Sequence, residues 1–499
     1  MARRAGGRMV GSVRCERRGP RIIAHDSPGR FCRGRFMALL PGYFLRVLLA
    51  GLAVVMADRT VARAVEDDAA KRVIVLANAS SAESMRLARY YAEKRAIPAE
   101  NIVALPMTLA ETIGWREFVD TVYQPLQDEL IKRGWVEATG STLTDEVGRK
   151  KYAVLGHRVS YLVTCRGVPL RVEHDQSLYA EVKPLTGTAA FRTNHGAVDA
   201  ELALVARSGY PINAYVPNPL FQKERPTSLD LGKVIKVSRL DGPGLEAAMG
   251  LVDHAIEAEK RGLIGRGYVD VGGPHPEGDQ WMEDVVKQLT ALDYDMSVDR
   301  APETMSAEAR FDAPALYFGW YAWQVNGPFT REGFRFPPGA VALHIHSFSA
   351  ETLSAVDRTW TGPLVARGVT ATVGNVYEPY LTFTHHPHLL LRALARGETW
   401  GDAVFYSLRA VSWQCVAIGD PLYRPFKVRF AEQWVKRAEL PNGLYPYVIL
   451  REVRRLERAG QPEQAAGVLR EALKERPGMA VLEARLTELS EGGGRAEAK

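Results

Sequence analysis

Short apolar segments alternate with amphipathic segments of helical period along most of this chain, and this alternation constrains the fold more than any other feature. Residues 72–77 form an apolar run, residues 84–92 carry apolar side chains at helical spacing, and a second run follows at 101–105. The pattern recurs, with apolar runs at 159–164, 234–237, 267–271, 315–318, 340–345, 369–373 and 416–418 and helical segments at 114–133, 244–260, 279–292, 386–396 and 400–410. Strands that alternate with helices form parallel sheets covered on both faces. The sequence therefore predicts an α/β fold with a doubly wound, mostly parallel sheet.

The alternation is interrupted once and ends before the C-terminus. Residues 173–230 are polar and rich in Pro and Asn, so we expect an insertion or a long functional loop between an α/β subdomain at 65–172 and an α/β domain at 231–430. From residue 440 only helical periodicity is left, at 447–458, 462–475 and 480–489. The region 440–490 resembles a tetratricopeptide hairpin with about one repeat. It predicts a helical appendage that packs on the domain.

The first 64 residues differ in charge from the rest of the chain. They hold thirteen Arg, no Lys and three acidic residues, a net of +10, whereas the whole chain carries +6, so the remainder is net −4. The apolar run 47–57 follows Arg46 and precedes the A-x-A pattern at 62–64, which is typical of a secretory signal whose true start is Met37. We expect an exported protein of the periplasm or cell surface. An uncleaved interfacial anchor is the alternative.

Several classes of partner and chemistry are disfavoured. Because the net positive charge is confined to residues 1–64, the rest of the chain lacks the charge of a nucleic-acid-binding protein, and no segment after the signal is long and apolar enough to span a membrane. Phosphate loops, CxxC pairs, H-E-x-x-H helices and G-x-S-x-G elbows are absent from the sequence. Cys165 and Cys415 are expected to be buried thiols, with a disulfide between them as the alternative.

Polar and aromatic residues cluster where three predicted strands end, at 319–323, 344–349 and 374–380. In open α/β sheets, ligands bind beyond the carboxyl ends of the strands. Because His344 and His346 are two residues apart on a strand, their side chains share a face and are candidate metal ligands. The packing of both imidazoles against neighbouring loops is the alternative. No cofactor other than such a metal is predicted.

Two serines in the second cluster are candidates for chemistry. Ser347 or Ser349 is placed where a nucleophile would stand, with His344 or His346 as its base. A serine at a strand-to-helix junction is also a common helix cap, which is the simpler interpretation.

Four short stretches, at 237–240, 256–260, 397–403 and 417–421, resemble in content and order those of gingipain-like cysteine peptidases. The resemblance implies a caspase-like fold, in which a catalytic His follows one central strand and a catalytic Cys follows the next. Here Trp320 stands near the position of the His, and Ser347 lies in the second segment, which contains no Cys. The resemblance therefore implies a caspase-like domain without the usual catalytic dyad.

Residues 72–426 resemble more closely an uncharacterised family of exported bacterial proteins associated with exosortase sorting systems, through matching stretches at 88–98, 164–170, 198–202, 238–243 and 374–380. This resemblance implies export and fold, but no activity. We therefore expect a non-catalytic binding or accessory protein of the cell envelope that recognises a peptide, a glycan or an envelope protein. Its candidate binding residues are Arg166, Asp199, Trp320, Tyr321, Ser349 and Glu378. The alternative is a peptidase-like or metal-dependent hydrolase with a rearranged site at the three strand ends.

Overall fold

The apolar runs of the sequence form two neighbouring sheets in the computed structural model, which describes residues 68–140, 142–179, 191–207 and 209–496. The six-stranded sheet has the order β15 (Thr372–Asn375), β17 (Cys415–Ile418), β10 (Lys236–Leu240), β6 (Tyr161–Cys165), β1 (Val73–Asn78) and β2 (Ile102–Leu105). The four-stranded sheet has the order β12 (Met296–Asp299), β11 (Arg266–Asp270), β13 (Pro314–Trp320) and β14 (Val341–Ile345). The predicted regions 65–172 and 231–430 thus contribute strands to the same six-stranded sheet.

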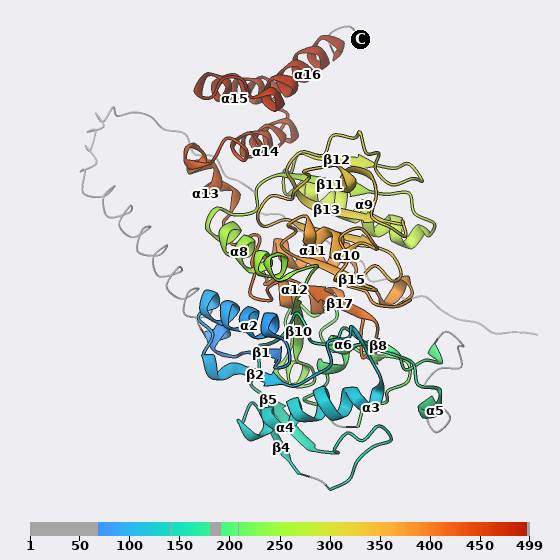
Figure 1. Cartoon of the computed structure of the whole chain (residues 1–499). Coiled ribbons are helices and arrows are strands. Elements are labelled where there is room, and N and C mark those ends of the chain that lie inside the picture. Colours follow the sequence, from blue (N-terminus) through green and yellow to red (C-terminus); the bar gives the residue numbers. More distant parts are fainter. Residues whose placement is uncertain (1–67, 141, 180–190, 208, 497–499) are drawn as a thin grey trace, which may run out of the picture. The chain divides into compact units, whose positions relative to one another are not determined.

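Most neighbouring strands run parallel. The pairs β2–β1, β1–β6 and β6–β10 are parallel, as are β12–β11, β11–β13 and β13–β14. β15 and β17 are antiparallel. A parallel bridge between Val341 and Ala371 places β14 next to β15, so the strands follow one another across both sheets in Figure 1. The predicted α/β fold is confirmed, with mixed sheets in which parallel pairing predominates.

The central strands are buried on both faces, which explains their continuous apolar runs. Successive side chains of a strand point to opposite faces of the sheet. Ile74 and Leu76 accordingly pack in one hydrophobic cluster, while Val73 and Val75 pack in another.

Helices contribute further apolar side chains to each of these two clusters. α2 (Ala82–Arg95), α8 (Leu245–Arg261) and α10 (Thr361–Ala366) contribute leucines and valines to the cluster of Val73. The other cluster takes apolar side chains from α4 (Gln124–Lys132), α9 (Pro276–Ala291), α11 (Pro387–Ala395) and α12 (Trp400–Ser407). Helices therefore cover both faces, as the alternating pattern predicts.

The region 173–230 contains short elements rather than one long loop. They are α5 (Gln176–Tyr179), β8 (Gly196–Ala197), α6 (Val198–Leu202), β9 (Val216–Pro217) and α7 (Ser228–Leu231). Val198, Leu202 and Leu204 are buried in the cluster that contains Ile74, so the part around α6 belongs to the domain core.

Short strands also join segments that lie outside the two main sheets. β4 (Val136–Thr139) and β5 (Ala153–His157) form an antiparallel pair. β3 (Thr112–Ile113) pairs with β7 (Arg171–Val172), β7 pairs with β8, and β9 pairs with β16 (Ala410–Val411).

The helix predicted at 114–133 consists of α3 (Trp115–Phe118), a π-helical turn (Val119–Tyr123) and α4.

The C-terminal residues form α13 (Phe430–Val435), α14 (Tyr445–Arg458), α15 (Pro462–Glu475) and α16 (Ala480–Ala496). Their apolar faces make a separate cluster that also includes Ile264 of the α/β domain. Arg454 forms an ion pair of 2.8 Å with the buried carboxylate of Asp295. The predicted helical appendage is confirmed, and it packs on the domain.

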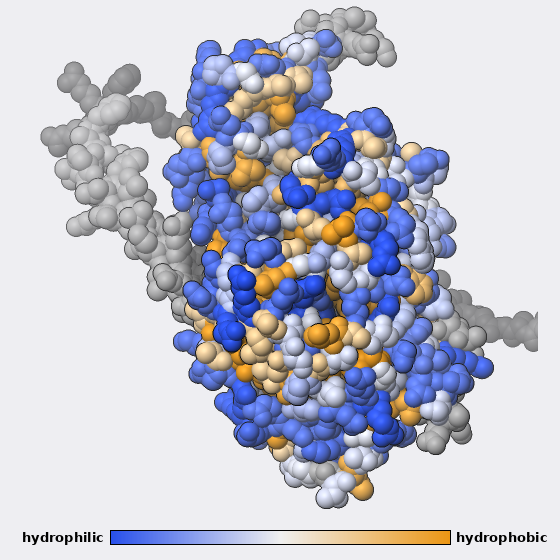
Figure 2. Space-filling view, viewed as in Figure 1, coloured by the Kyte–Doolittle hydropathy of each residue, from blue (hydrophilic) through white to orange (hydrophobic). Residues whose placement is uncertain are grey.

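Hydrophobic residues show in Figure 2 near these helices and across the hollowed middle of the visible face.

Cys165 and Cys415 are both buried and free, which confirms buried thiols rather than a disulfide. Burial raises the pKa of each thiol. The predicted signal and its cleavage pattern lie outside the described residues. In the part of the chain that the structure describes, no helix has the length and apolar character needed to cross a membrane.

Candidate functional site

The three predicted clusters meet in one cavity at the ends of β13, β14 and β15. Its volume is about 260 Å³. It is lined by His275, Trp320, Tyr321, Ile345, His346, Ser347, Asn375, Glu378, Pro379, Tyr380, Leu381 and Thr384. The convergence follows from topology, because β13, β14 and β15 are neighbours that end at the same edge. Of the candidate site residues, Trp320, Tyr321, His346, Ser347 and Glu378 line the cavity.

Trp320 forms a fixed wall of this cavity. Its side chain is 2% exposed, and its indole N–H donates to Asp279 at 3.0 Å. The ring lies so close to Gly273 and Gly278 that a Cβ atom at either glycine would come within about 2 Å of it. Trp320, at the position where the gingipain resemblance places a catalytic His, is thus held by packing and offers no basic nitrogen.

His344 is buried beside the cavity, and both of its ring nitrogens are used. Its Nε2 accepts the backbone N–H of Ala322 at 2.9 Å, so its proton is on Nδ1, which lies 2.9 Å from the hydroxyl of Tyr317. The ring stacks on Trp360 with a centroid distance of 3.6 Å. Burial lowers its pKa well below the usual range, which keeps the ring neutral. His344 therefore has no lone pair left for a metal or for the proton of a serine.

Of the two histidines of this strand end, His346 is the one that lines the cavity. Its Nδ1 lies 2.7 Å from the carbonyl oxygen of Ser347, which can only accept, so Nδ1 carries the proton. In the neutral ring Nε2 is then the acceptor nitrogen, and it has no hydrogen-bond partner among the described residues. The rings of Tyr321 and Trp323 lie 4.5 and 5.2 Å from the imidazole. The same described segments contain no group of three His, Cys, Asp or Glu side chains that could hold a metal ion.

The two candidate serines have different environments, and neither bonds to an imidazole. The hydroxyl of Ser347 donates to Oε2 of Glu378, whose Oε1 accepts the backbone N–H of Tyr380 at 3.0 Å. Ser349 is 1% exposed and lies outside the cavity lining, and its hydroxyl accepts the backbone N–H of Asn375 at 3.0 Å. Ser349 thus joins the ends of β14 and β15 and has a structural role.

Aromatic side chains surround the cavity and are unusually exposed for their size. Tyr321, Trp323 and Tyr380 are 45%, 52% and 39% exposed, and Trp323 also packs on Phe348. His275 lies 6.3 Å from Tyr321 between ring centroids. Tyr321 and Tyr380 line the cavity, and Trp323 lies beside it against His346. Exposed aromatic rings beside a cavity are common at binding surfaces.

Arg166 and Asp199, predicted to bind a ligand, lie outside the cavity in an ionic network that is buried at Asp199 and reaches the surface at Arg166, with Asp241 between them. The fully buried guanidinium of Arg239 donates to both carboxylate oxygens of Asp199, at 2.7 and 3.0 Å, and to the carbonyl oxygens of Val168 and Pro169. Arg166 donates to the carboxylate of Glu83 at 3.0 Å and to the carbonyl oxygen of Gly242. The network ties the segments after β6 and β10 together, and none of these residues lines the cavity.

Sequence reasoning missed three residues of this region. His275 and Asp279 follow β11, and the strand-end rule that selected the other clusters applies to them equally. Asp270 ends β11 and is 1% exposed, with Oδ1 lacking a partner among the described residues. Burial raises the pKa of Asp270 to about 7. The signal that could have identified Asp270 is that it is the only acidic residue in the strand Arg266–Asp270.

Comparison of the chain with family models, with curated proteins and with solved structures gave no match.

Proposed function

We propose that this chain is an exported, non-catalytic binding protein of the cell envelope whose strand-end cavity recognises a glycan. The scaffold is a caspase-like α/β domain without a catalytic dyad. One observation carries the proposal: exposed aromatic rings surround a cavity in which the only serine hydroxyl is bonded to Glu378 and not to an imidazole. The order β12-β11-β13-β14 with β15 beside β14, and the leader predicted at 1–64, support the fold and the export.

The chemistry of the lining favours a glycan over a peptide. Tyr321, Trp323 and Tyr380 present flat apolar faces on which sugar rings can stack. The carboxylate of Glu378, the hydroxyl of Ser347 and Nε2 of His346 offer hydrogen-bond acceptors for sugar hydroxyls. A peptide that binds by strand addition would need a free strand edge, and β13 and β14 are each paired on both sides.

An array of soluble oligosaccharides, probed with the labelled full-length protein, tests this proposal. We expect saturable binding to a restricted set of glycans, weakened about tenfold by Trp323→Ala and by Tyr321→Ala. Leu109→Ala removes an apolar side chain that is more exposed than either ring and lies away from the cavity, and it serves as the control. Binding that is unaffected by the aromatic substitutions, or that is restricted to peptides, would contradict the proposal.

A hydrolase is the second candidate, and the Ser347–Glu378 hydrogen bond is what favours it. A carboxylate can accept the proton of a serine that attacks a substrate, and Nε2 of His346 faces the same cavity. Ser347→Ala distinguishes the two functions. It abolishes the turnover of a bound ligand if Ser347 is a nucleophile, whereas if the site only binds, the loss of one hydrogen bond weakens glycan binding by no more than about tenfold.

A further inference from the structure

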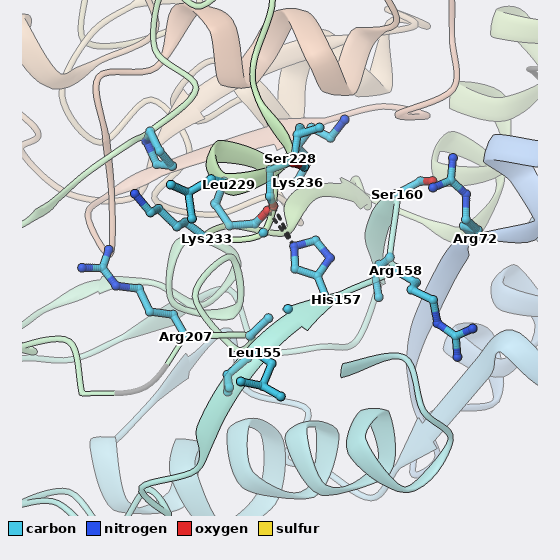
Figure 3. Close-up of a pocket in the computed structure, with 18 of the residues that line it drawn as sticks. Arg72, Leu155, His157, Arg158, Ser160, Arg207, Ser228, Leu229, Lys233 and Lys236 are labelled. Carbon is cyan, nitrogen blue, oxygen red and sulfur yellow. Dashed lines mark hydrogen bonds between the residues drawn. The ribbon is translucent and has the colours of Figure 1, made fainter. Parts of the chain in front are cut away.

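A second cavity, of about 1050 Å³, lies where β6 and β10 begin and shares no lining residue with the strand-end cavity. It is bounded by β5, by the turn after α6 and by α7 with the turn that leads to β10 (Figure 3). Every lining side chain that can carry a charge is basic: Arg72, His157, Arg158, Arg207, Lys233 and Lys236. We call this cavity the basic groove.

Part of this positive charge is not neutralised. Arg72 pairs with Asp68 at 2.9 Å, and Lys236 pairs with Asp402. In contrast, no acidic partner contacts Arg207 or Lys233 within the described segments. Figure 3 shows these two side chains on one side of the groove, with Arg158 and Arg72 on the other. Because residues 65–499 are net acidic, an uncompensated basic cavity departs from the charge of the rest of the domain.

Exposed leucines line the same groove. Leu155 of β5 is 74% exposed, Leu229 of α7 is 69% exposed and Leu231 is 37% exposed. Leu155 and Leu229 are among the most exposed large apolar side chains of the described chain. A ligand that fits this groove therefore combines negative charge with apolar side chains.

The strand β5 presents an open edge to this groove. It pairs with β4 along one edge, and the described residues provide no strand for the other. All five residues of β5 line the groove. An unpaired strand edge offers a row of backbone N–H and C=O groups. Many domains bind an extended peptide through hydrogen bonds to such an edge.

We infer that the basic groove binds an extended acidic segment of a partner protein, which adds to β5 as a third strand. Carboxylates of this segment pair with Arg207 and Lys233, and its alternate apolar side chains contact Leu155 and Leu229. The concave shape and the free strand edge favour a peptide over a flat membrane surface, which would use the charge and the leucines but not the strand edge.

Fluorescence anisotropy of a fluorescein-labelled peptide of alternating glutamate and valine, added to the full-length protein, tests this inference. We expect saturable binding that weakens as salt is raised and that falls at least about tenfold in the double variant Arg207→Glu/Lys233→Glu. The double variant Lys287→Glu/Lys474→Glu makes the same change in net charge at exposed sites away from the groove and should keep the affinity within about twofold. Circular dichroism establishes that both variants are folded.

Two further probes separate strand addition from charge attraction alone. Methylation of alternate amide nitrogens of the peptide should abolish binding, and hydrogen exchange of the amides of β5 should slow when the unmodified peptide binds. Absence of binding, equal losses in the two double variants, equal binding of a peptide with lysine in place of glutamate, or binding only to vesicles of anionic phospholipid would each overturn the inference.

Discussion

The hydroxyl of Ser347 donates its hydrogen bond to the carboxylate of Glu378 and not to either neighbouring histidine. His344 is occupied by Tyr317 and Ala322, and His346 directs its N–H to a backbone carbonyl. A serine–histidine pair, which the sequence allowed, is therefore not formed. The exposed rings beside the cavity and the absence of a serine–histidine pair support the proposed role in recognition.

Replacement of His344 should destabilise the protein, because its ring stacks on Trp360 and accepts a buried N–H. We expect His344→Ala to lower the free energy of unfolding by about 2–4 kcal/mol, from the lost packing and the two unpaired polar groups. Urea denaturation followed by tryptophan fluorescence measures this. His346→Ala, which removes one hydrogen bond at the cavity, should cost about 1 kcal/mol. Equal costs for the two variants would argue against a structural role specific to His344.

Asp199 should be essential for stability, because it is the main counter-charge of the buried Arg239. Asp199→Ala leaves that guanidinium poorly compensated in the core, and we expect a loss of about 3–5 kcal/mol. The exposed pair of Lys287 with Asp284 gives the control, since Asp284→Ala should cost less than about 1 kcal/mol. A small effect of Asp199→Ala in thermal denaturation would show that Asp241, 3.4 Å from Arg239, suffices as a partner.

Asp270 should make stability depend on pH. Burial raises its pKa to about 7 from an ordinary value of 3.8, so the folded state binds a proton more tightly than the unfolded state. Its contribution to stability is therefore fully present below about pH 4 and is lost as the pH rises through about 7. Asp270→Asn should be more stable than the wild type at pH 8 by at most about 4 kcal/mol, with little difference at pH 4. Denaturation curves at both pH values check this, and a wild-type advantage at pH 8 would contradict it.

We expect cleavage after the A-x-A pattern, so that the protein recovered from the cell begins at residue 65. Amino-terminal sequencing of the protein recovered from the cell envelope measures this directly. Removal of residues 1–64 takes away a net charge of +10, so the mature form should also focus at an acidic pH, unlike the full chain with its pI of about 9.0. Recovery of a protein that begins at residue 1 would contradict both the cleavage and the start at Met37.

Much of the fold and the place of the site could be predicted, because both depend on local patterns. Burial on both faces gives β1, β6, β13 and β14 their continuous apolar runs, and the helical period marked the segments that became α8 and α9. The rule that ligands bind beyond strand ends was sufficient to select 319–323, 344–349 and 374–380, which converge on one cavity. The appendage was predictable for the same reason, since the helices α14, α15 and α16 each carry a local amphipathic pattern.

The sequence by itself determined the succession of strands and helices, since periodicity and burial are properties of neighbouring residues. Only the tertiary structure decided which partner each polar side chain takes. Ser347 bonds to Glu378, 31 residues away, and Arg239 bonds to Asp199, 40 residues away. The basic groove likewise depends on β5, α7 and the turn after α6 coming together. A hydrogen bond requires contact to within a few tenths of an ångström, and distances between remote segments are set by the packing of the whole core.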